Sequence, residues 1–170
     1  MTPASFGMEI IRYFVGFLML AAATGKLRTL ADFRANLTSS FGVGAAFSAA
    51  LAPAIIVLEL AAAVLVLGPW STTGMLASLL MLGLFTLVVC YKFFTQSVVK
   101  CSCFGEAGRS VSGIDLLRNG VVLVSIIAYL YQGGGVTVGL AAAILAAALA
   151  ALLCVIAIEA HDIVTLLARY

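Results

Sequence analysis

Five apolar runs, each about as long as a membrane-crossing helix, constrain the fold more than any other feature of this sequence. About 20 residues of helix cross the roughly 30 Å hydrocarbon core of a bilayer, where a helix can be apolar all round. Composition agrees, because 64% of the residues are hydrophobic and only 9% are charged, whereas soluble domains are about a quarter charged. We predict an all-α integral membrane protein, one domain over residues 1–170, with four to five transmembrane helices at 6–24, 47–67, 73–94, 114–131 and 138–158.

Two connections between these runs are longer than a turn. Residues 25–46 space their apolar side chains roughly as one face of a helix and put charged side chains on the other faces. This pattern predicts a short interfacial helix after the first transmembrane helix. The other long connection is residues 95–113, where Ser112 and Asp115 have the spacing of a helix-capping pair.

The basic residues are distributed unequally between the two sides of the bundle. With five crossings, the first and third connections share one side, which carries Lys26, Arg28, Arg34, Lys92, Lys100 and Arg109. The connections on the other side contain no Lys or Arg. The positive-inside rule therefore predicts that the first and third connections are cytoplasmic. The net charge of +2 is too small and too dispersed to suggest a nucleic-acid partner.

Two of the four cysteines, Cys101 and Cys103, are separated by one residue in the third connection. Such a pair can close a disulfide or hold a soft metal ion as thiolates. A disulfide across one residue is strained and easily reduced, which makes the pair a good oxidant. Lys100 and Arg109 favour the reactive thiolate form. The alternatives are two unrelated cysteines or a purely structural bridge.

The other two cysteines, Cys90 and Cys154, lie near the ends of the third and fifth apolar runs. Those two helices run in the same direction, so both thiols fall in the membrane half that holds the Cys101 connection. They are either small apolar core residues or a second relay pair beneath Cys101 and Cys103.

Four of the polar residues within or at the ends of the apolar runs are candidates for a shared pocket. Glu59 lies near the centre of the second run, Lys26 ends the first, and Arg118 and Asn119 lie one turn into the fourth. Charged side chains inside a membrane are costly and usually face the bundle interior. We expect Glu59 to pair with Lys26 or Arg118, either as simple helix packing or as a polar pocket beneath the dithiol that steers a proton or holds a quinone carbonyl.

The order of these motifs resembles the MauE/DoxX superfamily of redox-associated membrane proteins, and more closely MauE. The matching elements span most of the chain: Thr24-Gly25-Lys26-Leu27, Leu58-Glu59-Leu60, the Cys-x-Cys-Phe-Gly signature Cys101-Ser102-Cys103-Phe104-Gly105, and Arg118-Asn119. The resemblance implies thiol–disulfide chemistry alongside a thioredoxin-like partner, because the family is associated with maturation of a disulfide-rich enzyme subunit. The Ala-rich run 138–158 has no clear counterpart, and its small residues predict close packing on the bundle or on a second copy.

The leading hypothesis is a thiol–disulfide oxidoreductase of a prokaryotic cytoplasmic membrane. Cys101 and Cys103 are its catalytic pair, a thioredoxin-like protein its partner and a membrane quinone its acceptor, with no metal expected. One alternative is a protein that binds or transports a soft metal such as Cu, Zn or Hg, and another is a non-catalytic assembly factor for a redox partner. Disulfide chemistry usually occurs outside the cytoplasm, so the function and the charge distribution disagree about the side that bears the Cys101 connection.

Overall fold

The computed structural model describes residues 3–95, 112–133 and 138–167, with side chains for residues 4–160 of these ranges. Every regular element in the described residues is an α-helix. The helices are α1 (Pro3–Arg28), α2 (Leu30–Ser39), α3 (Ala45–Leu67), α4 (Ser71–Thr95), α5 (Gly113–Tyr131) and α6 (Leu140–Leu167). Five of them, all except α2, are long and apolar enough to cross a membrane. The prediction of an all-α membrane bundle is therefore confirmed, with five helices in the described residues able to cross the membrane.

The predicted helices match the observed ones except at their ends. The first was expected at residues 6–24 but runs from Pro3 to Arg28, and the last was expected at 138–158 but runs from Leu140 to Leu167. Helices continue beyond the hydrocarbon while their backbone hydrogen bonds can still form. Apolar length marks the membrane segment and not the helix end, so both helices are longer than their apolar runs.

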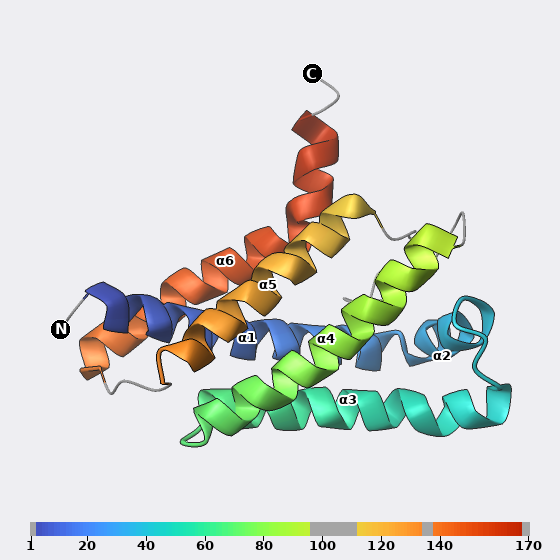
Figure 1. The fold of residues 1–170 in the computed structure, drawn as a ribbon, viewed down its shortest axis with the longest axis horizontal. Coiled ribbons are helices and arrows are strands. Elements are labelled where there is room, and N and C mark those ends of the chain that lie inside the picture. The colour runs from blue at the N-terminus through green and yellow to red at the C-terminus, as the bar shows by residue number, and fades with distance from the viewer. Residues whose placement is uncertain (1–2, 96–111, 134–137, 168–170) are drawn as a thin grey trace.

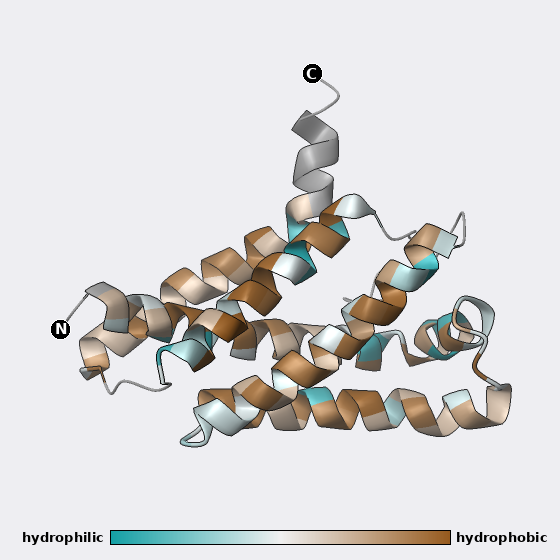
Figure 2. Ribbon diagram, viewed as in Figure 1, coloured by the Kyte–Doolittle hydropathy of each residue, from teal (hydrophilic) through white to brown (hydrophobic). Residues whose placement is uncertain are grey.

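Helix α1 forms the centre of the bundle. It packs against each of the other five helices, while α3, α4, α5 and α6 follow one another around it, each touching the next (Figure 1). Val15 and Ala23 on α1 have no exposed surface, and Ile126 and Tyr129 on α5 are equally buried in the core. The helices consist mostly of hydrophobic residues (Figure 2), and many large apolar side chains are exposed on the bundle surface, as the bilayer requires.

The α3–α4 hairpin is tight because glycine lies where the two helices meet. A Cβ added at Gly74 would clash with the Val66 backbone nitrogen and lie 2.7 Å from the Leu65 carbonyl carbon. From this contact α3 and α4 diverge toward the end of the bundle that carries α2 (Figure 1).

Helix α2 confirms the short helix predicted between residues 25 and 46. Its apolar side chains Phe33 and Leu37 are buried and form a small core with Ala52 of α3. The apolar face of α2 therefore packs on the bundle.

The start of α5 is fixed by the predicted capping pair. The Ser112 backbone N–H and hydroxyl both donate to Asp115 Oδ2, each at 2.9 Å. The carboxylate thus satisfies a donor at the first turn. This cap ends the connection 96–111, which lies outside the described residues together with Cys101 and Cys103.

Candidate functional site: a membrane cavity with a buried ion pair

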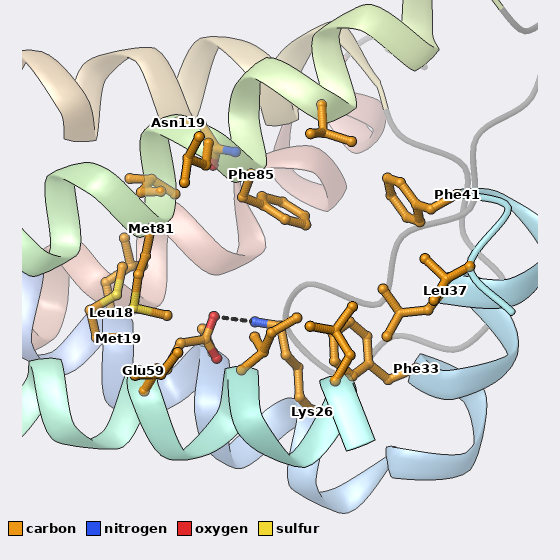
Figure 3. Close-up of a pocket in the computed structure, with 18 residues that line it drawn as sticks. Leu18, Met19, Lys26, Phe33, Leu37, Phe41, Glu59, Met81, Phe85 and Asn119 are labelled. Atoms are coloured by element: carbon orange, nitrogen blue, oxygen red, sulfur yellow. Dashed lines mark hydrogen bonds and ion pairs between the residues drawn. The ribbon is translucent and has the colours of Figure 1, made fainter. Parts of the chain in front are cut away.

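A cavity of about 400 Å³ lies between the helices in the half of the bundle where α3 and α4 diverge (Figure 3). This volume is within the range of small-molecule sites, about 300–1,000 Å³. Three of its lining residues are polar: Lys26, Glu59 and Asn119. The others are apolar: Leu18, Met19, Ala22, Phe33, Leu37, Phe41, Val43, Leu51, Ile55, Leu58, Met81, Leu82, Leu84, Phe85 and Val88.

The Lys26 ammonium and the Glu59 carboxylate form an ion pair in the cavity wall. Lys26 Nζ donates to Glu59 Oε1 at 2.6 Å (Figure 3). Only 5% of the Lys26 side chain and 12% of the Glu59 side chain are exposed. Of the two pairings expected from the sequence, the structure confirms Glu59 with Lys26. Each charge offsets the cost of burying the other in an apolar environment.

Two further features define the surroundings of this pair. Lys26 Nζ lies 5.8 Å from the centre of the Phe33 ring, so α2 supplies an aromatic face to the cation. On the other side, Glu59 Oε2 is buried and accepts no hydrogen bond from any described residue. A buried carboxylate oxygen without a donor is costly, and this one belongs to a residue that lines the cavity. The pair therefore keeps unused hydrogen-bonding capacity next to the cavity.

The side chains of Asn119 and Arg118 have different surroundings although the two residues are adjacent in the sequence. Asn119 lines the cavity and donates from Nδ2 to Thr86 Oγ1 at 3.3 Å. Arg118 is not among the lining residues, and its Nη1 lies 3.7 Å from Asp115 Oδ1. Neighbouring side chains on a helix point about 100° apart, and here only Asn119 lines the cavity. The predicted polar pocket thus contains Lys26, Glu59 and Asn119, without Arg118.

The cavity lies close to the two helix ends that carry the Cys101–Cys103 connection. Val88 is seven residues before Thr95, and Asn119 six residues after Gly113. At 1.5 Å per residue, these lining residues are about 10 Å from the ends of α4 and α5.

Cys90 and Cys154 are both free thiols. No Cα atom of α4 lies within 8 Å of any Cα atom of α6, and a disulfide needs about 7 Å or less. Cys154 is instead buried in the apolar core around α1. The structure does not bring these two cysteines together, because α5 lies between their helices.

The cavity also uses residues that sequence reasoning did not single out. Phe41 and Phe85 are aromatic walls, and Met19 and Met81 place flexible side chains near the ion pair (Figure 3). In a chain with 10 Phe and 5 Met, individual apolar residues carry no such signal. The helical spacing of Phe33 and Leu37 was visible, but it could not show that they cover a cavity.

The arrangement suits a ligand that is mostly apolar and has a small polar head. The walls offer apolar and aromatic surface, while Lys26 and Asn119 supply hydrogen-bond donors and Glu59 an acceptor. A carbonyl oxygen is a suitable partner for the ammonium, and a hydroxyl for the carboxylate. Both groups occur on a ring that interconverts between quinone and quinol.

Comparison with protein families gives one match. The sequence profile of the family described as methylamine utilisation protein MauE matches residues 4–132. The match covers α1 to α5, and so every residue that lines the cavity, but not α6. No significant match was found among curated proteins or among solved structures.

Proposed function

The chain belongs to the MauE family of membrane proteins, and from that premise we propose that it is a membrane thiol–disulfide oxidoreductase. Cys101 and Cys103 are its redox pair, a thioredoxin-like protein is its thiol partner, and a quinone of the bilayer is its electron acceptor. The observation that carries the proposal is the cavity, which has a buried ion pair and lies within about 10 Å of the helix ends that hold the cysteine connection.

The proposed reaction transfers two electrons and two protons. The thioredoxin-like partner gives its two thiols and leaves with a disulfide, while the Cys101–Cys103 disulfide is reduced to two thiols. Those thiols are then reoxidised to the disulfide and release two electrons and two protons. A bound quinone takes up both and leaves as quinol. Each cycle therefore converts one dithiol and one quinone into one disulfide and one quinol.

The residues of the cavity have separate roles in this proposal. Lys26 holds a carbonyl oxygen by donating a hydrogen bond, and its positive charge favours electron transfer toward that oxygen. Asn119 supplies a second donor from α5. Glu59 keeps Lys26 in place through Oε1 and uses Oε2 to hold or pass a proton. The apolar walls exclude water, which strengthens these polar interactions.

The test uses the purified protein in lipid nanodiscs with a reduced thioredoxin-like protein and a quinone. We expect quinol to form with the wild type but not with the Cys101→Ser/Cys103→Ser variant, which should have the same unfolding midpoint. Full activity of the double variant would contradict the proposal. Thiolate-dependent copper or zinc in the purified protein would favour the metal alternative. If the double variant loses activity but still binds the partner, the protein is a catalyst and not only an assembly factor.

A further inference from the structure

The cavity wall includes three apolar residues that are also strongly exposed on the outside of the bundle. They are Leu58 of α3, which is 55% exposed, and Leu84 and Val88 of α4, which are 67% and 41% exposed. The three polar lining residues, in contrast, are all buried. The cavity therefore has an apolar mouth between α3 and α4, and its three polar residues belong to the buried part of the wall.

This mouth lies within the membrane-spanning parts of both helices. Leu58 is near the middle of α3 (Ala45–Leu67), and Leu84 is near the middle of α4 (Ser71–Thr95). At 1.5 Å per residue, Leu84 is at least about 16 Å from either end of its helix. The mouth thus opens onto hydrocarbon, where a ligand arriving from water would first have to enter the bilayer.

We propose that the cavity takes its ligand sideways from the bilayer through the mouth formed by Leu58, Leu84 and Val88. The ligand is an amphiphile whose hydrogen-bonding head reaches Lys26 and Asn119 while its apolar tail remains in the mouth and the surrounding lipid. The proposal depends on the proposed function for the choice of a quinone as that amphiphile. It adds the route of entry, the orientation and the requirement for a tail.

Two features of the structure favour this orientation over the reverse. The polar lining residues Lys26, Glu59 and Asn119 are all buried, whereas the residues of the mouth are exposed and apolar. A tail placed inside would leave the ion pair facing apolar atoms, whereas a head placed at the mouth would give up its hydrogen bonds to hydrocarbon. Head-first binding satisfies both ends of the ligand.

The test measures equilibrium binding in the Cys101→Ser/Cys103→Ser background, so that no electron transfer occurs. The probes are a benzoquinone with a long isoprenoid tail and the same ring without a tail, each titrated into nanodiscs with and without protein. Leu84→Trp narrows the mouth. Leu80→Trp is the matched control, because Leu80 lies one turn earlier on α4, is 66% exposed and does not line the cavity.

We expect Leu84→Trp to raise the Kd of the tailed quinone at least about tenfold and to leave the tailless ring within about twofold. Leu80→Trp should change neither. An alkane of the tail's length should not compete, because it has no head for Lys26. The proposal is overturned if Leu84→Trp weakens binding of both quinones equally, or if the two Trp variants have equal effects. It is also overturned if the alkane competes or if the tailed quinone does not bind.

The result of this binding test can be distinguished from the result of the activity test of the proposed function. If the protein binds the tailed quinone selectively but the wild type transfers no electrons, entry through the mouth is supported and the proposed oxidoreductase activity is overturned. If quinol formation depends on the thiols but is unchanged by Leu84→Trp, the oxidoreductase activity is supported and entry through the mouth is overturned.

Discussion

The Lys26 ammonium lies 2.6 Å from the Glu59 carboxylate although 33 residues separate the two in sequence. The contact joins the end of the central helix α1 to the middle of α3, inside the membrane and in the wall of the cavity. A charge facing lipid at this depth would cost about 2.5–3.5 kcal/mol on insertion scales. The pair therefore explains how both charges can be held within the bundle.

Breaking this ion pair should destabilise the fold, and removing both charges should restore much of the loss. We expect Lys26→Met to lower the free energy of unfolding by about 3–5 kcal/mol, because Glu59 is left buried without its cation. The Lys26→Met/Glu59→Gln variant should recover most of that stability but not the quinol-forming activity. Denaturant unfolding in detergent micelles measures the stabilities. Additive losses in the double variant would show that the two side chains are not coupled.

The close approach of α3 and α4 should depend on the absence of a side chain at Gly74. We expect Gly74→Ala to destabilise the protein by about 1–3 kcal/mol, because the new Cβ meets the backbone of Leu65 and Val66. Gly83→Ala, on the same helix, is the control, since a Cβ there meets nothing within 4 Å. Thermal unfolding of both variants checks the prediction, which fails if the two midpoints shift equally.

Asn119 should contribute to ligand binding independently of its hydrogen bond to Thr86. We expect Asn119→Leu to weaken binding of the tailed quinone about three- to tenfold, the effect of one lost hydrogen bond. Thr86→Val removes the partner but keeps the Asn119 amide in the cavity wall, and should have a smaller effect. Equal weakening by the two variants would mean that Asn119 acts only through Thr86.

The distribution of basic residues predicts the side of the membrane that bears Cys101 and Cys103. Lys26, Arg28, Arg34 and Lys92 all lie on α2 or in the last turns of α1 and α4. The positive-inside rule puts this end in the cytoplasm. A membrane-impermeant thiol reagent, applied to intact cells after reduction, should therefore leave both cysteines unlabelled and label them after lysis. Labelling in intact cells would assign the connection to the outside.

Most of the fold could be predicted because lipid imposes simple requirements on a sequence. A spanning helix must be apolar for about 20 residues, and this requirement located all five crossings. The Ser112–Asp115 cap was equally readable, because both partners are local. The ends of α1 and α6 could not be predicted, since a helix can continue after its apolar run stops.

The residues of the site could be predicted only where a charged or polar residue occurs in an otherwise apolar helix. Glu59 and Lys26 stand out because charges are rare in membrane helices. Arg118 looked equally suitable, but it forms its ion pair with Asp115 in the first turn of α5. Depth along the chain suggested that Cys90 and Cys154 could meet. Depth says nothing about which helices are neighbours, and α4 and α6 are not.

The central claim is that Cys101 and Cys103 pass their electrons to a quinone in the bilayer. The most direct measurement is an anaerobic single turnover of the fully reduced protein in nanodiscs with excess tailed quinone, counting quinol formed and thiols lost. We predict one quinol for every two thiols lost in the wild type, and none in the Cys101→Ser/Cys103→Ser variant. Loss of thiols without quinol, or quinol formation in the double variant, would contradict the account.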